Sequence, residues 1–153
     1  MLADDDKAAF EAAAKILARL PQNNLSPAPM YEFEVPAKPF GSDAAAQAEA
    51  VFDEGSVYEL YKECGSASFT ALATLEGMSV GVLATNKTED KLTPLDASKL
   101  AGFVRMCDSF NIPVVTFVDT KGFELDENGA VNAMAKLSHA YAEAATVKLA
   151  VVT

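Results

Sequence analysis

The sequence predicts an α/β fold, and three observations carry this prediction. Segments 68–75 and 79–85 each alternate two sets of side chains, and Glu76-Gly77 between them is a turn signal, which predicts a β-hairpin. Further along the chain, segments with helical spacing alternate with short apolar runs, as expected of parallel strands joined by helices. A chain of 153 residues is long enough for one domain with a buried core.

The sequence before the hairpin predicts helices and an irregular segment. Residues 4–20 form a helix that starts with acidic residues, which suits the helix dipole, and that ends at Pro21. Its apolar stripe consists of Phe10, Ala13, Leu17 and Leu20. Residues 22–43 are rich in proline, which excludes a helix interior or a central strand. Two interpretations stay open for them: a disordered linker, and an extended arm whose apolar residues lie against a surface.

Two short helices are expected next, over residues 44–52 and 57–64. After the hairpin, Thr93-Pro94-Leu95-Asp96 predicts a helix start with a capping box and a proline at the first helical position. Residues 114–118 form an apolar run that predicts a strand covered on both faces. A helix over 130–145 and one more buried strand over 149–152 complete the series, so parallel pairing with right-handed crossovers is expected.

Composition and charge exclude several classes of protein. The net charge of −10 repels phosphate backbones, so no nucleic acid partner is expected. No apolar run approaches the roughly 20 residues of a membrane helix. The acidic start resembles neither a signal peptide nor a transit peptide, and these features together predict a cytoplasmic protein. Cys64 and Cys107 form no C-x-x-C motif, and we expect free thiols.

Few side chains are candidates for chemistry. The one histidine, His139, lies in the middle of a predicted helix, where we expect a partly buried structural role. No nucleotide-binding, zinc or serine-hydrolase motif occurs. The acidic segment 124–127 is expected to be a solvated face, and because it lacks the spacing of a calcium loop, no metal site is predicted.

The turn Gly122-Phe123 is the main candidate site. It follows the apolar strand 114–118 at the strand's C-terminal end, where open α/β sheets bind ligands. A glycine at this place lets backbone amides point outward, as a turn that stabilises an oxyanion requires. A connecting turn without a function stays an equally open interpretation.

Four stretches of the sequence resemble acyl-CoA carboxyltransferase subunits. Residues 103–119, FVRMCDSFNIPVVTFVD, resemble the family pattern RF-x-R-F-C-D-A-F-N-I-P-L-V-T-F-V-D. Residues 20–24, 52–59 and 135–144 resemble its YLPxNN, xDxGSFFE and AKLLYAYAEA segments in the same order. The family includes propionyl-CoA and acetyl-CoA carboxylases and the alpha subunits of methylmalonyl-CoA and glutaconyl-CoA decarboxylases. The resemblance covers nearly the whole chain.

The resemblance implies a truncated crotonase-like ββα spiral. Residues 1–51 are then a helix and a proline-rich arm, and residues 52–153 are part of a C-terminal carboxyltransferase domain. In this family a carboxyl group moves between biotin on a carrier protein and an acyl-CoA. One half of each subunit holds acyl-CoA, the other half faces biotin, and this chain matches the start of the second half. The implied partners are a biotin carboxyl carrier protein, the acyl-CoA half of a partner subunit and further copies of the chain.

The resemblance also implies the site residues. Gly122 and Phe123 match the turn that lines the biotin side, with their backbone amides as the catalytic groups and Lys121 beside them. Lys121 stands where the family has proline, which makes the turn less rigid. Asn132-Ala133 replaces an arginine-histidine pair. These departures favour the decarboxylase-like branch, whose complexes can be attached to a membrane.

The family pattern continues beyond Thr153 with a YGGAY segment that carries an oxyanion hole. We therefore expect a fragment that is inactive alone and that self-associates through the apolar residues 149–152. Two other functions stay open. One is a non-catalytic crotonase-like module that assembles a carboxylase or decarboxylase complex. The other is a different crotonase-like enzyme such as a hydratase, although no acid pair is evident for it.

Overall fold

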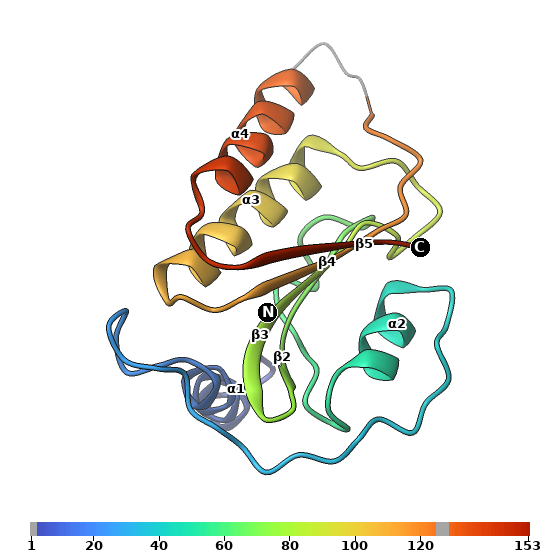
Figure 1. The fold of residues 1–153 in the computed structure, drawn as a ribbon. Helices are drawn as coiled ribbons and strands as arrows, with labels where there is room; N and C mark the ends of the chain where they lie inside the picture. The colour runs from blue at the N-terminus through green and yellow to red at the C-terminus, as the bar shows by residue number, and fades with distance from the viewer. Residues whose placement is uncertain (1–2, 125–128) are drawn as a thin grey trace.

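The computed structural model describes residues 3–124 and 129–153. Within these residues, five strands form one sheet in the order β1-β2-β3-β4-β5, in which β1, β2 and β3 pair antiparallel and β3, β4 and β5 pair parallel. Helices lie on both faces of the sheet (Figure 1). The elements are α1 (Asp6–Arg19), α2 (Ala44–Val51), β1 (Tyr58–Glu59), β2 (Phe69–Leu75), β3 (Met78–Ala84), α3 (Pro94–Ser109), β4 (Val114–Val118), α4 (Ala130–Glu143) and β5 (Lys148–Val152).

The hairpin of β2 and β3 closes through the predicted turn Glu76-Gly77. Both residues have positive φ, 49° and 79°, which matches the twist of the strands. A Cβ on Gly77 would lie 2.3 Å from the Tyr31 carbonyl oxygen, so glycine is required. The buried Asp53 carboxylate accepts hydrogen bonds from both turn amides at 2.9 Å. Burial raises the pKa of Asp53, but hydrogen bonds from Thr74, Gly77 and Glu76 outweigh burial, so the pKa is lowered.

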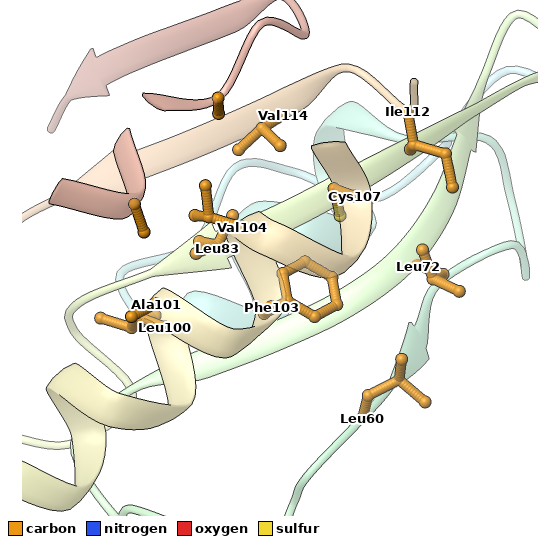
Figure 2. Packing of buried hydrophobic residues seen from close by; sticks show 12 residues of the cluster. Leu60, Leu72, Leu83, Leu100, Ala101, Phe103, Val104, Cys107, Ile112 and Val114 are labelled. Atoms are coloured by element: carbon orange, nitrogen blue, oxygen red, sulfur yellow. The ribbon is translucent and has the colours of Figure 1, made fainter. Parts of the chain in front are cut away.

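Each face of the sheet has its own hydrophobic core. α3 and α4 cover one face, where Leu83 of β3 and Phe103 of α3 belong to one buried cluster (Figure 2). α2 covers the other face, where the Phe52 and Phe117 rings meet edge to face with centroids 6.3 Å apart. Val82, next to Leu83, belongs to this second cluster. Successive residues of β3 therefore enter different cores, and both faces of the strand are buried.

α3 begins with the capping box that the sequence predicts. The Thr93 hydroxyl accepts a hydrogen bond from the Asp96 amide at 3.2 Å, and the Asp96 carboxylate accepts one from the Thr93 amide at 3.0 Å. The helix ends at Ser109, and Asn111 takes a left-handed φ of 54° before Pro113. Local sequence signals therefore place both ends of this helix.

The segment after α1 forms an extended arm beside the hairpin turn (Figure 1). The Tyr31 amide donates to the Gly77 carbonyl at 3.0 Å, and the Glu54 amide donates to the Glu34 carbonyl at 2.9 Å. The Phe40 ring lies 6.3 Å from the ring of Phe117. These contacts favour the arm over the disordered linker. The sequence predicts a domain boundary between residues 51 and 52. α2, which lies before this boundary, packs into the second core, and the boundary stays a prediction.

The predicted apolar stripe of α1 is wrong at Phe10, Ala13 and Leu17 and right at Leu20. Phe10 and Leu17 are exposed, and no residue of α1 is fully buried. The side chains that pack against the first core are Ile16 and Leu20. Alanine-rich helices offer several stripes of similar hydropathy, so periodicity alone does not choose the one that faces the sheet.

The predicted helix over residues 57–64 is also wrong. Tyr58 and Glu59 form β1, which pairs with Leu72 and Ala71 of β2, and a turn follows. β2, with which β1 pairs, comes after an intervening loop. The spacing of residues within 57–64 therefore does not indicate a strand.

β5 has the predicted strand conformation but not the predicted burial. Leu149 is 56% exposed and Val152 is 83% exposed. Among the described residues, β5 is an edge strand of the sheet and pairs with β4 along one side only. An apolar sequence therefore identified a strand but not its position in the sheet.

Candidate functional site

The candidate site lies at the edge of the sheet where the parallel strands β3 and β4 end. Loop 85–93 follows β3 and turn 119–124 follows β4, and Figure 1 shows both on the same side of the molecule. The Leu92 amide donates to the Gly122 carbonyl at 2.9 Å, and the Glu124 amide donates to the Leu92 carbonyl at 2.8 Å. These bonds form a short parallel bridge between Leu92 and Phe123. The main chain of the predicted site residues is therefore held by backbone hydrogen bonds.

Side chains add two further links between the loops. The Asp119 amide donates to the Thr85 hydroxyl at 3.1 Å. Lys121 forms an ion pair with Glu89, and the hydrogen bond between them raises the pKa of Lys121 and lowers the pKa of Glu89. Both side chains are exposed, so the pair adds little to stability. Its effect is to hold a lysine ammonium beside the turn.

Gly122 and Phe123 differ in what their backbone amides can offer. Gly122 has a φ of 94°, a conformation that a side chain would strain. Its amide already donates to the Thr120 hydroxyl at 3.1 Å. Among the residues that the structure describes, the Phe123 amide has no acceptor. Within the described residues, the Phe123 amide therefore keeps its donor capacity, whereas the Gly122 amide is occupied by the Thr120 hydroxyl.

An open hollow of about 520 Å³ lies next to this bridge. It lies between the two loops and the segment before β2, and its lining consists of Ser66, Asp90, Lys91, Thr93, Phe123 and Glu124. This volume is within the range of small-molecule sites, roughly 300–1,000 Å³. All of these residues except Phe123 are polar or charged, and both signs of charge are present, so the hollow can admit a polar group.

A buried polar cluster supports the start of β2 beside this hollow. Asp96 is fully buried, and its carboxylate accepts hydrogen bonds from the Ser68 amide at 2.9 Å and from the Ser68 and Thr93 hydroxyls at 2.7 and 2.6 Å. The Lys99 ammonium donates to the Ser68 carbonyl at 2.8 Å. Burial raises the pKa of Asp96, but the hydrogen bonds from Thr93 and Ser68 outweigh burial and lower it. Burial lowers the pKa of Lys99.

The sequence predicts Asp96 only as a helix cap and does not single out Lys99. Both residues share one side of α3 with the buried Leu100 and Phe103, at the helical spacing i, i+3, i+4 and i+7. Charged residues on a buried side of a helix are rare unless they are paired. The charge of Asp96 and Lys99 at these positions is therefore the sequence signal that could have identified them.

The other predicted side chains lie outside the site. His139 is exposed, not partly buried, and its Nδ1 lies 2.8 Å from the Glu143 carboxylate one turn further along α4. Cys64 and Cys107 are free thiols, and burial raises the pKa of Cys107 to about 12, which makes it a poor nucleophile. Residues 125–127 of the acidic segment lie outside the described residues. In the part of the chain that the structure describes, no group of ligating side chains could hold a metal ion.

Comparison with known proteins identifies the family. The carboxyl transferase domain family matches residues 1–153. This chain belongs to that family. It is 32% identical to the propionyl-CoA carboxylase carboxyltransferase subunit of Haloferax mediterranei, over 98% of this chain and 33% of the relative. It is also 32% identical to the methylmalonyl-CoA decarboxylase subunit alpha of Veillonella parvula, over 90% of this chain and 31% of the relative.

A solved carboxyltransferase has the same fold as this chain. The crystal structure of transcarboxylase 12S superimposes on this chain with a TM-score of 0.90 at 33% identity. The matched region covers 98% of this chain and 33% of the transcarboxylase chain. The carboxyl transferase chain therefore has the crotonase-like α/β fold that the resemblance implies. It spans about a third of the length of the curated relatives that it matches.

The helices that the structure describes are short or polar. None of them combines the length and the apolar composition that crossing a bilayer requires.

Proposed function

We propose that this chain supplies the biotin-facing part of an acyl-CoA carboxyltransferase. A carboxyl group then moves between a carrier-bound biotin and the carbon beside the thioester carbonyl of a short acyl-CoA. The observation that carries the proposal is the family match over residues 1–153, which includes the turn 119–124. The named relatives include a propionyl-CoA carboxylase and a methylmalonyl-CoA decarboxylase, which supports a short acyl group.

In this proposal, Lys121, Gly122 and Phe123 line the biotin side. When the carboxyl group leaves the biotin nitrogen, negative charge develops on the ureido oxygen, and a backbone amide directed at that oxygen stabilises it. The Phe123 amide is the first such donor, and the Gly122 amide is the second once the Thr120 side chain turns away. The Lys121 ammonium, held by Glu89, places further N–H donors beside the turn. The hollow of about 520 Å³ has room for the ureido ring.

The proposed partners are a biotin carboxyl carrier protein, a half that binds acyl-CoA in a partner subunit, and further copies of the chain. The length of this chain, about a third of its relatives, supports the need for a second half. Transcarboxylase 12S assembles as a hexamer and binds methylmalonyl-CoA, which supports an oligomer. We place the protein in the cytoplasm, or at the membrane if it serves a decarboxylase complex that is attached there; the methylmalonyl-CoA decarboxylase subunit alpha of Propionigenium modestum is one of its relatives.

Binding of biocytin tests the biotin-side role. Adding biocytin to the ¹⁵N-labelled chain should shift the backbone resonances of Gly122 and Phe123, and Nε-acetyllysine, which lacks the ureido ring, should not. Phe123→Ala keeps the amide and should retain most of the shift at Gly122, whereas Phe123→Pro removes the amide and should abolish it. Equal behaviour of the two variants would contradict the role of the amide.

Two further experiments test the scope of the proposal. The 153-residue chain, mixed with carboxybiotin and propionyl-CoA, should transfer no carboxyl group. Turnover under these conditions would contradict the expected inactivity. A biotinylated carrier protein should retain the chain more strongly than the same carrier without biotin. Equal retention would support the alternative function, a non-catalytic assembly module.

A further inference from the structure

A second hollow lies at the opposite end of the hairpin from the candidate site. It has a volume of about 470 Å³ and lies between residues 18–19 at the end of α1, residues 31–34 of the arm, and residues 53–56 after α2. Figure 1 shows α1 and the arm beside the turn that joins β2 to β3. The proposed carboxyl transfer makes no use of this hollow.

One residue that lines the hollow has a hydroxyl group without a partner in the described part of the chain. Tyr31 lines it, and the Tyr31 hydroxyl oxygen is buried with no hydrogen bond to any residue that the structure describes. Native structures pair nearly all such groups with protein, water or a ligand, because an unpaired buried hydroxyl destabilises the fold. The Tyr141 hydroxyl shows the usual situation, since it lies 2.8 Å from the Thr116 hydroxyl. The Tyr31 hydroxyl therefore has an unused capacity to form a hydrogen bond.

Arg19 supplies a positive charge in the same hollow. Its guanidinium donates to the Lys15 carbonyl at 2.9 Å and to the Ser56 carbonyl at 3.2 Å, and it lies 5.2 Å from the centre of the Tyr58 ring. These contacts fix its position and use part of its donor capacity, since a guanidinium has five N–H groups. Burial raises the pKa of Tyr31 more than Arg19 lowers it, so the hydroxyl keeps its proton at neutral pH and can donate.

The acidic residues of the hollow limit the charge of a ligand. Both oxygens of the Asp53 carboxylate already accept hydrogen bonds from the Glu76 and Gly77 amides. Glu32, Glu34 and Glu54 are exposed, so water weakens their repulsion of a negative ligand but does not remove it. The remaining repulsion grows with the charge of the ligand, so it opposes a phosphate more strongly than a single carboxylate.

We propose that this hollow binds a small molecule through a single carboxylate, which accepts hydrogen bonds from the Tyr31 hydroxyl and the Arg19 guanidinium. Arginine suits a carboxylate because its planar fork matches the two carboxylate oxygens. A bound ligand would connect α1, the arm and the turn after α2, and would therefore stabilise the arm. This site is independent of the proposed carboxyl transfer.

Three matched probes test the proposal: benzoate, benzamide and benzylamine, which share a ring and carry a carboxylate, a neutral amide and an ammonium group. Benzoate should raise the melting temperature of the chain and shift the backbone resonances of residues 31–34 and 53–56. Benzamide should bind more weakly, and benzylamine should leave both measurements unchanged.

Two tyrosine variants make the test specific. Tyr31→Phe removes an unpaired hydroxyl, so it should raise the melting temperature without ligand and weaken benzoate binding about tenfold. Tyr141→Phe removes a paired hydroxyl, so it should lower the melting temperature and leave benzoate binding unchanged. The proposal is overturned if no probe binds, if benzylamine binds best, or if Tyr31→Phe binds benzoate as the wild type does. A melting temperature that falls in Tyr31→Phe as in Tyr141→Phe would also overturn it. Because biocytin is expected at the other end of the hairpin, its failure to bind leaves this result unaffected.

Discussion

β3 and β5 lie in the same sheet and have similar apolar sequences, but their environments are opposite. Every residue of β3 after Met78 is buried, whereas β5 is exposed except at Val151, which is half-buried. β3 pairs with strands on both sides and contributes to both cores, while β5 pairs with β4 alone. The comparison shows that position in the sheet, not composition, decides how much each strand contributes to stability.

The largest expected effect is a contrast between two leucines. Leu83→Ala in β3 removes a fully buried side chain and should lower the free energy of unfolding by about 3 kcal/mol. Leu149→Ala in β5 removes a side chain that is 56% exposed, and it should change the free energy of unfolding by less than about 0.5 kcal/mol. Urea denaturation of both variants measures the difference. Equal losses would show that β5 is buried in solution.

The next effect concerns the buried polar cluster of Asp96, Ser68, Thr93 and Lys99 at the start of β2. Asp96→Asn keeps the shape but loses a carboxylate that accepts hydrogen bonds from Ser68 and Thr93, so it should lower the free energy of unfolding by about 2 kcal/mol. Asp90→Asn is a matched control, because Asp90 is exposed, and it should have almost no effect. Similar losses in the two variants would contradict the role of the cluster.

The same carboxylate predicts a dependence on pH. The pKa of Asp96 is lower in the folded chain than the ordinary value near 3.9, so its stabilising effect is present above about pH 4 and is lost as the pH falls through the folded pKa. The stability gap between the wild type and Asp96→Asn should therefore be constant from pH 7 to about pH 5 and shrink below about pH 4. A gap that grows on acidification would show that the pKa is raised instead.

A smaller effect is expected where β4 meets α4. The Tyr141 and Thr116 hydroxyls are 2.8 Å apart, and Tyr141→Phe leaves the Thr116 hydroxyl without this partner. The free energy of unfolding should fall by about 1 kcal/mol. Thr116→Val removes the other hydroxyl, and the double variant should lose less than the sum of the single losses. Additive losses would indicate that the hydroxyls do not interact.

The smallest effect on stability should accompany a change in association. β5 is an apolar strand whose outer edge has no partner strand among the described residues, and we expect this edge to mediate self-association at high concentration. Leu149→Lys should weaken the association while stability changes by less than about 0.5 kcal/mol. Leu95→Lys is the control, since Leu95 is 55% exposed but lies on α3. A wild type that sediments as a strict monomer would contradict the expectation.

Local signals predicted the elements whose cause is local. The turn at Glu76-Gly77, the cap at Thr93 and the order of elements from residue 68 onward follow from conformation, capping and periodicity. β1 and the side of α1 that packs against the first core could not be predicted in this way, because each depends on a partner far away in the chain. In the candidate site, the position of Gly122 and Phe123 after β4 was predictable, but the bridge to Leu92 was not.

The sequence by itself determined the family and the α/β fold, and it selected the turn after β4 as the candidate site. These conclusions depend on residue types and their spacing. Only the tertiary structure decided that β5 is exposed, that the Gly122 amide donates to Thr120, and that Tyr31 has a buried hydroxyl beside Arg19. The physical reason is that burial and hydrogen bonding depend on which distant groups surround an atom, and local spacing does not contain that information.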